Sequence, residues 1–197
     1  MDTISKYKAI KILHQKRIRF FTLADAKKFF GQTKDNTLYK IIQRLEASEV
    51  IARISQGKYH FLLREVDDFE LANFLMRPSC ISLESALSFY GILPQFAYTI
   101  TSVTPLKSKK IIYNDKEYEF AHLSKKYFFG FEKEKNFLLA SPEKALLDEL
   151  YFTAKKLRQV HFADLDLKRI DKKKLKGLAK NYSFLPLENL LKKLKLI

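Results

Sequence analysis

Residues 20–63, FFTLADAKKFFGQTKDNTLYKIIQRLEASEVIARISQGKYHFLL, decide the fold of the amino-terminal part of the chain. Apolar residues recur every three or four positions within residues 36–48, and this spacing predicts an amphipathic helix. Two strand-like runs follow, joined by Gln56 and Gly57, where glycine can supply the positive φ of a tight turn. The stretch therefore predicts a helix followed directly by a two-stranded hairpin. The apolar positions of the helix are Leu38, Ile41, Ile42 and Leu45.

The opposite face of this helix carries small, hydrogen-bonding and cationic side chains. A polar, cationic helix followed by a basic hairpin is typical of a winged helix-turn-helix, whose helix enters the major groove of DNA and reads base edges. A solvated helix face is the alternative interpretation of the same pattern. The residues expected to contact DNA are Asn36, Thr37, Lys40, Gln43 and Arg44 on the helix, Lys34 at its start, Arg53, Gln56 and Lys58 on the hairpin, and Arg17 and Arg19 nearer the amino terminus.

The residues before this helix complete the expected amino-terminal domain. A first helix is predicted over residues 4–14, with Tyr7 on its apolar side, and a short strand is predicted over residues 17–21. A second helix then runs to Gly31, which suits a helix end. The candidate caps are Thr22 for the second helix, with Asp25 three residues later, and Thr33 or Asp35 for the third.

Acidic residues at positions 65–70 interrupt the basic pattern and mark a domain boundary. Helical periods, then strand-like periods and then helical periods follow it, which predicts a mixed helix–sheet domain that ends in a helical tail. The expected fold class is therefore α+β, with a winged helix-turn-helix over residues 1–65 and the mixed domain over residues 66–197.

The second domain begins with helices and continues with strands. A helix is predicted over residues 79–90 with Ser82 as its cap, and Asn114-Asp115 is a suitable hairpin turn. Ser141-Pro142 opens a later helix with proline at its first position, and two amphipathic helices close the chain. The strand-like runs cover residues 98–104, 110–113, 118–122 and 136–140.

The chain of 197 residues has a net charge of +15, which is concentrated at its two ends. Residues 1–63 carry +8 and residues 155–197 carry +9, whereas the residues between them carry −2. Cationic surfaces of this size favour polyanions such as nucleic acid. The lysines of the tail fit a solvated face, a second DNA-contacting surface or a site for an anionic partner. They are Lys172, Lys173, Lys174, Lys176 and Lys180.

Residues that serve in catalytic and metal sites are present, but their spacing does not favour such a site. The four histidines lack the one-turn spacing of a metal-binding helix, and there is no glycine-rich phosphate loop. Glu143, Asp148 and Glu149 near Lys144 would permit a metal-dependent nuclease, but Asp148 and Glu149 project about 100° apart on a helix. Helix-cap and surface roles explain them more simply. We expect no enzyme, no metal and no cofactor.

The single Cys80 excludes an internal disulfide and a cysteine zinc site, and its apolar surroundings predict a buried thiol. We find neither a signal peptide nor an apolar run of transmembrane length, so we expect a cytoplasmic protein that does not enter a membrane. The absence of a heptad seam favours a monomer in solution that pairs on inverted DNA repeats.

Four blocks of the second domain carry a family resemblance: PSCISLESALSFYGILP (78–94), YTITSVTP (98–105), YEFAHLSKKYFFGFEK (118–133) and LLASPEKALLDELYF (138–152). In this order they resemble the C-terminal domain of the AbiE-type antitoxins (AbiEi family), which belong to bacterial type IV toxin–antitoxin systems and act in phage defence by abortive infection. The preceding winged helix is similar to that family's architecture.

The resemblance implies a bifunctional protein without a catalytic role. Its N-terminal domain would repress its own operon by binding inverted repeats in the promoter. Its C-terminal domain would counteract a toxin that resembles nucleotidyltransferases, and this antagonism does not require a stable complex. Two alternatives stay open: an unrelated winged-helix transcriptional regulator with a ligand-sensing C-terminal domain, and a nucleic-acid-processing enzyme.

Overall fold

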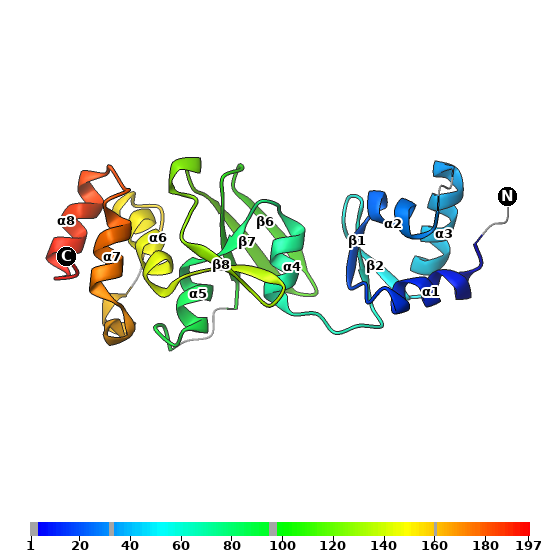
Figure 1. Ribbon diagram of the computed structural model, residues 1–197, viewed down its shortest axis with the longest axis horizontal. Coiled ribbons are helices and arrows are strands. Elements are labelled where there is room, and N and C mark those ends of the chain that lie inside the picture. The colour runs from blue at the N-terminus through cyan, green and yellow to red at the C-terminus, as the bar shows by residue number, and fades with distance from the viewer. Residues whose placement is uncertain (1–3, 32–33, 95–97, 160) are drawn as a thin grey trace. The chain divides into compact units, whose positions relative to one another are not determined.

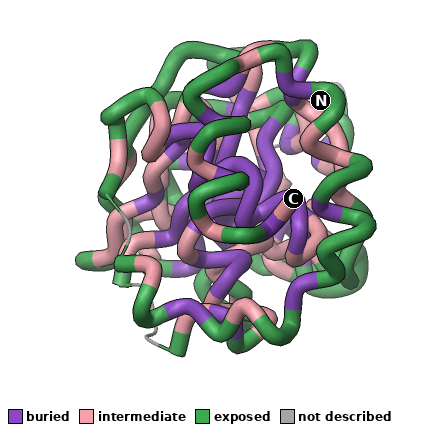
Figure 2. The backbone as a smooth tube through the Cα atoms, turned by 90° about the vertical axis from the view of Figure 1, so that its left-hand side faces the viewer, coloured by how far each residue is buried: buried purple, intermediate pink, exposed green. Residues whose placement is uncertain are grey.

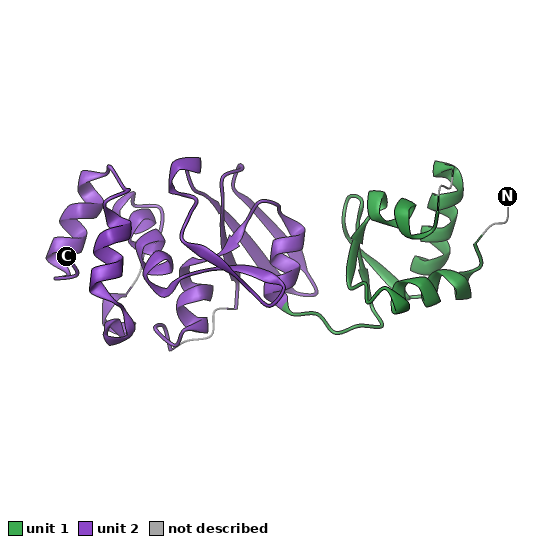
Figure 3. Ribbon diagram, in the orientation of Figure 1, with its two compact units in different colours: residues 1–67 green, residues 68–197 purple. Residues whose placement is uncertain are grey.

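The structure is a computed structural model. It divides into two compact units, Met1–Asp67 and Asp68–Ile197 (Figure 3), close to the boundary expected after residue 65. In the described part of the chain there are eight α-helices and two β-sheets (Figure 1), so the predicted α+β fold class is confirmed. The described residues are 4–31, 34–94, 98–159 and 161–197.

Three helices and a three-stranded sheet make up the described part of the first unit. The strand order is β1-β3-β2, and both strand pairs are antiparallel. The hairpin of β2 and β3 follows α3 directly, and Gly57 at its turn has a φ of +69°. The elements are α1 (Lys6–Gln15), β1 (Phe20–Thr22), α2 (Leu23–Phe29), α3 (Asp35–Ala47), β2 (Ile51–Ser55) and β3 (Lys58–Phe61).

The apolar face of α3 lies in the core of the first unit, and all four residues of its predicted stripe are buried. From α1 the core takes Ala9 and Leu13, which are one turn apart. Tyr7 was expected on this side, but it is 76% exposed. The expectation was wrong because Tyr7 lies six positions before Leu13 and therefore about 120° away around the helix.

The helix caps follow the sequence at α2 and differ from it at α3. Thr22 and Asp25 form a capping box, in which the Asp25 amide donates to Thr22 Oγ1 at 3.1 Å and the Thr22 amide donates to Asp25 Oδ2 at 2.9 Å. Lys34 is the N-cap of α3 and makes no side-chain cap, and Asp35 is already helical. Thr33, the other candidate, lies outside the described residues.

Six strands of the described part of the second unit form a mixed sheet with the order β6-β7-β5-β4-β9-β8. Its turns include Asn114 and Asp115, whose φ angles of 49° and 57° fit the predicted two-residue hairpin turn. The elements are α4 (Asp68–Leu75), β4 (Cys80–Ile81), α5 (Leu83–Phe89), β5 (Ile100–Thr104), β6 (Lys109–Tyr113), β7 (Lys116–His122), β8 (Phe131–Glu134), β9 (Phe137–Ala140), α6 (Pro142–Ala154), α7 (Lys172–Ala179) and α8 (Leu185–Lys193).

Two elements of this sheet differ from the sequence prediction. Cys80 and Ile81 form a strand between β5 and β9, where a helix from residue 79 was expected, and α5 begins only at Leu83. The apolar spacing of a helix continues through Cys80 and Ile81, so periodicity alone could not separate the strand β4 from the helix α5. Strand β8 was not predicted, because its sequence FEKE alternates charges without an apolar face.

Helices cover both faces of the sheet, with α4 on one side and α5 and α6 on the other (Figure 1). Neighbouring residues of β7 mark the two sides. The hydroxyl of Tyr118 donates to Asp68 of α4 at 2.9 Å, and Glu119 accepts from Arg158, which follows α6, at 2.6 Å. Successive side chains of a strand point to opposite faces of the sheet, so Tyr118 contacts the α4 side and Glu119 contacts the side of α5 and α6.

The tail helices α7 and α8 pack against α6 on its side away from the sheet (Figure 1). They bury the apolar residues Leu175, Leu187 and Leu191 and leave their lysines exposed. Figure 2 shows the result along the backbone, with buried segments in the interior and exposed turns outside. Helix α6 is thereby enclosed between the sheet and the tail.

Candidate nucleic-acid interface

The exposed face of α3 carries the helix residues that the sequence predicts to contact DNA. Thr37 is half-buried, and the other residues are exposed. Because the buried stripe anchors the opposite side of the helix, these side chains point away from the core. The exposed residues are Lys34, Asn36, Lys40, Gln43 and Arg44.

The hairpin brings a second set of predicted residues close to the end of α3. Arg53 and Gln56 are exposed, and Lys58 is half-buried. Burial raises the pKa of the Tyr59 phenol on β3, the nearby carboxylate of Glu46 on α3 raises it further, and Arg53 lowers it. Arg53 of the hairpin and Glu46 of the helix therefore lie around the same tyrosine.

Several cations of this surface are available for an external anion. Within the described residues, the side chains of Lys40, Arg44 and Arg53 form no ion pair with a carboxylate, whereas Lys27 pairs with Asp35 at 2.8 Å. Phosphate contacts by these three cations would not have to displace an internal partner. Such contacts position a protein on DNA, and base contacts supply the specificity.

The two arginines before the second helix have different environments. Arg17 is exposed, with a φ of 53°, in the turn that connects α1 to β1. Arg19 is half-buried and interacts with other residues of the chain. Arg17 is therefore the more accessible of the two.

The lysines of the tail form a separate group in the second unit. All five predicted residues are exposed on α7 or directly after it, while Leu175 anchors the helix. The ammonium of Lys172 donates to the backbone oxygen of Lys195 at 3.1 Å, which ties α7 to the end of α8. The five are Lys172, Lys173, Lys174, Lys176 and Lys180.

The charged residues of α6 contradict the sequence interpretation. Glu143, Asp148 and Glu149 were expected to have cap and surface roles, but they are 6%, 0% and 0% exposed, and the neighbouring Lys144 is 1% exposed. The expectation was wrong because α6 is enclosed on both sides, so even its polar positions face other elements. Their charges therefore need partners inside the second unit.

Asp148 is the centre of one such set of partners. It forms an ion pair with Lys144 one turn earlier, and it accepts hydrogen bonds from Ser82 Oγ and from the Tyr182 hydroxyl, each at 2.8 Å. Ser82 precedes α5 but does not cap it with its side chain, contrary to the prediction. The carboxylate of Asp148 thus connects α6 to the sheet side and, through Tyr182, to the tail.

Arg158 is the centre of a second set, in which one guanidinium meets three carboxylates from three elements. It lies 2.6 Å from Glu84 of α5, 2.6 Å from Glu119 of β7 and 3.7 Å from Glu149 of α6. Neither side-chain oxygen of Glu149 has a hydrogen-bond partner in the described structure. Burial raises the pKa of Glu149 to about 8, the charge of Glu84 adds to the shift, and Arg158 opposes it.

The second unit will lose stability as the pH rises from about 5 to about 8. Glu149 has a pKa of about 8 in the folded chain instead of its ordinary 4.5, so the native state binds more protons in this window. The stability that Glu149 contributes is fully present below about pH 4.5 and is lost as the pH rises past about 8. Glu149→Gln will flatten this dependence in urea unfolding at several pH values. Asp164→Asn, at an exposed position, is the control. If Glu149→Gln left the pH dependence of the unfolding free energy as steep as the control does, the raised pKa of Glu149 would be contradicted.

Gly130 allows the aliphatic part of Lys144 to approach the backbone. It has a φ of +73°, and a Cβ atom there would lie 3.2 Å from Lys144 Cγ. Gly130→Ala will therefore destabilise the chain by about 1–3 kcal/mol. Gly177→Ala, inside α7 with nothing within 4 Å, is the control and will stabilise it by about 0.5–1 kcal/mol. Chemical denaturation measures both, and a Gly130→Ala chain as stable as wild type would show that Lys144 lies elsewhere.

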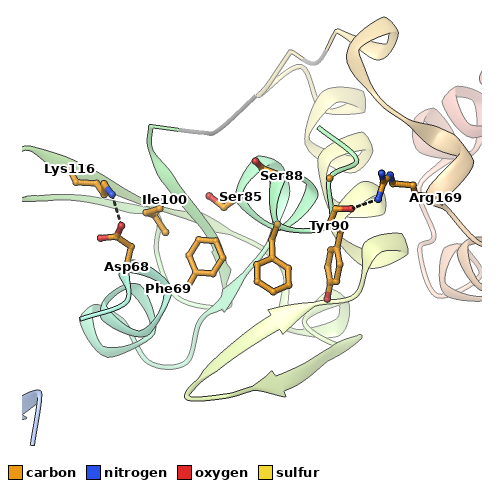
Figure 4. A pocket seen from close by; sticks show the side chains of 10 residues that line it. Asp68, Phe69, Ser85, Ser88, Tyr90, Ile100, Lys116 and Arg169 are labelled. Carbon is orange, nitrogen blue, oxygen red and sulfur yellow. Dashed lines mark hydrogen bonds and ion pairs between the residues drawn. The ribbon is translucent and has the colours of Figure 1, made fainter. Parts of the chain in front are cut away.

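A pocket of about 670 Å³ lies in the second unit between α4, α5 and β5 (Figure 4). Lys116 lies at one end, paired with Asp68, and Arg169 lies at the other, 3.0 Å from Asp166. Both cations therefore already have carboxylate partners at the two ends of the pocket. The aromatic rings along it are Phe69, Phe89 and Tyr90.

The described residues offer little for metal or thiol chemistry. They contain no group of three or more histidine, cysteine or carboxylate side chains placed to hold a metal ion. Cys80 is buried, as predicted, and burial raises the pKa of its thiol. No helix among them has the length and apolar character needed to cross a bilayer.

Comparison with known families and with curated proteins found no match for this chain at a significant level.

The sequence prediction missed the partners of the buried charges, which come from distant segments. The one available signal was the four-residue spacing of Lys144 and Asp148, which places an ion pair on one helix face but does not reveal burial. The missed residues are Glu84, Glu119, Arg158 and Tyr182, and Ser82 was expected as a helix cap instead of as a partner of Asp148.

Proposed function

We propose that the first unit is a winged helix-turn-helix that binds duplex DNA, with α3 as the recognition helix and the β2–β3 hairpin as the wing. One observation carries the proposal: Lys40, Arg44 and Arg53 project from this helix and hairpin and have no carboxylate partner among the described residues. Lys40 and Arg44 would donate to guanine acceptors or phosphates, and Asn36 and Gln43 would pair with adenine. Arg53 would contact the phosphate backbone of the DNA.

We further propose that the whole chain is a DNA-binding antitoxin of a type IV toxin–antitoxin system. The first unit would repress its own operon at promoter inverted repeats, and the second would counteract a nucleotidyltransferase-like toxin in the cytoplasm without catalysis. The four sequence blocks of the second unit and the two basic ends of the chain support this proposal. A toxin reading frame directly downstream of the gene would add support that does not depend on DNA binding.

Binding of the purified chain to its own upstream DNA tests the repressor proposal. If the cations of the first unit neutralise six or more phosphates, affinity will fall about a thousand-fold or more between roughly 50 and 200 mM salt. Gel shifts at several salt concentrations measure this slope, with a scrambled duplex of equal length as the control. Equal affinity for both duplexes, or a flat salt dependence, would argue against a sequence-reading winged helix.

The pocket in Figure 4 favours one second candidate, a winged-helix transcriptional regulator whose second unit senses a small molecule. An uncharged aromatic ligand that raises the thermal stability of the second unit and changes promoter affinity would support this reading. Rescue from a downstream toxin would support the antitoxin. Reproducible cleavage of DNA or RNA in the presence of Mg²⁺ would contradict the non-enzymatic role in both.

A further inference from the structure

The two edges of the six-stranded sheet differ in how they are protected. Among the described residues, β6 and β8 are the end strands. The outer strand β8 carries exposed Glu132, Lys133 and Glu134, and charges of this kind block pairing with another strand. In contrast, β6 ends in the β-forming run Ile111, Ile112, Tyr113, and Ile112 is 71% exposed. The β6 edge therefore lacks the usual protection along half of its length.

The register of the hairpin shows which backbone groups of β6 point outward. Tyr113 and Lys116 flank the two-residue turn, so they form a hydrogen-bonded pair, and Ile111 pairs with Tyr118 in the same way. The N–H and C=O groups of Lys110 and Ile112 then point away from β7. The β8–β9 hairpin provides a check. Its register leaves the amide of Leu138 on β9 pointing away from β8, and this amide donates to Asn73 Oδ1.

Exposed apolar side chains lie in β6, at its two ends and beside it. Ile112 lies in the strand, Leu106 precedes it and is 45% exposed, and Tyr98, 69% exposed, donates from its hydroxyl to Asp115 at the hairpin tip. Leu157, 64% exposed, borders a hollow of about 350 Å³. Exposed apolar groups near an unpaired strand edge are a feature of interaction surfaces. The hollow is also lined by Lys109, Lys110, Phe120 and Phe152.

The charge of the edge selects the kind of partner. Lys107 and Lys109 are exposed, and within the described residues neither forms an ion pair. Lys110 is engaged by Glu117 at 2.9 Å and Glu119 at 3.3 Å. A segment that pairs with β6 would therefore gain from carboxylates opposite the two available lysines. DNA is a poorer occupant, because its phosphates could accept from the outward N–H groups but offer nothing to the apolar side chains or to the outward C=O groups.

We propose that β6 is a docking edge for an extended segment of another protein, which adds a strand to the sheet. The segment alternates apolar and acidic residues: its backbone pairs with Lys110 and Ile112, one apolar side chain enters the hollow beside Leu157, and its carboxylates face Lys107 and Lys109. This surface belongs to the second unit and does not depend on DNA binding by the first. If the chain counteracts a partner protein, β6 is where the two make contact.

A labelled peptide of about nine residues that alternates glutamate and valine tests the proposal by fluorescence anisotropy. The full chain will bind it, and Ile112→Pro will weaken binding about tenfold or more, because proline removes one outward amide without breaking a bond to β7. Lys133→Pro removes the corresponding outward amide of β8 and will leave the affinity unchanged. Thermal melts check that both variants fold, and Ile112→Lys replaces Ile112→Pro if it does not.

Three results would overturn the proposal. The first is no binding of the acidic peptide, or equal binding by the Ile112 and Lys133 variants. The second is equal or tighter binding of a peptide with lysine in place of glutamate. The third is a dimer that forms with rising concentration in light scattering and is lost in Ile112→Pro, since the edge would then pair with a second copy. Amide hydrogen exchange that slows at Lys110 and Ile112 when the peptide is added would support it.

Discussion

Replacing Asp148 with alanine will lower the free energy of unfolding of the second unit by about 3–5 kcal/mol, because it leaves the buried ammonium of Lys144 without its counter-charge. Lys144 is only 1% exposed, so water cannot replace the lost carboxylate. Ser82 and Tyr182 lose their acceptor in the same variant. Urea unfolding of the full chain, monitored at the transition of the second unit, measures the loss.

Two variants separate the unpaired charge from the loss of packing. Lys144→Met with Asp148→Leu removes both charges and will cost less than Asp148→Ala alone, because no ion is left buried without a partner. Asp164→Ala, at an exposed acidic position of the same unit, will change stability by less than about 0.5 kcal/mol. If Asp148→Ala were as stable as Asp164→Ala, the buried pair would not exist in solution.

The double variant Lys40→Ala, Arg44→Ala will bind promoter DNA on the order of 100-fold more weakly than wild type, since each lost contact costs about 1–3 kcal/mol. Both side chains are exposed, so the fold will not change. Gel shifts at fixed salt measure the loss, and the salt dependence will become shallower by about one unit of slope per phosphate contact removed.

The matched control for this variant removes the same charge from another helix. Lys8→Ala, Lys11→Ala changes two exposed lysines of α1 and leaves α3 and the hairpin intact. It will weaken binding only slightly, through the long-range field of the protein. Equal losses in the two double variants would mean that net charge, and not the face of α3, binds DNA. Toxin rescue will remain largely intact in both.

The first unit could be predicted closely because its signals are local. The stripe of α3 repeats with the helical period, Thr22 and Asp25 cap α2 within four residues, and Gly57 sets the turn between adjacent strands. Each feature depends on neighbours in the sequence, whose geometry the backbone fixes. The exposure of the α3 residues expected to contact DNA follows for the same reason, since the buried stripe of a helix determines its opposite face.

In the second unit the later helices, several strands and the turn at Asn114-Asp115 could be predicted from the sequence, whereas the burial of particular charges depends on how the elements pack. Lys144 and Asp148 have the same spacing as a surface ion pair, and Cys80-Ile81 continues a helical pattern although it is a strand. The enclosure of α6 and the partners from Ser82 and Tyr182 depend on segments far apart in the chain. Whether a helix is buried depends on the elements that cover it, and the spacing of residues within the helix does not reveal those elements.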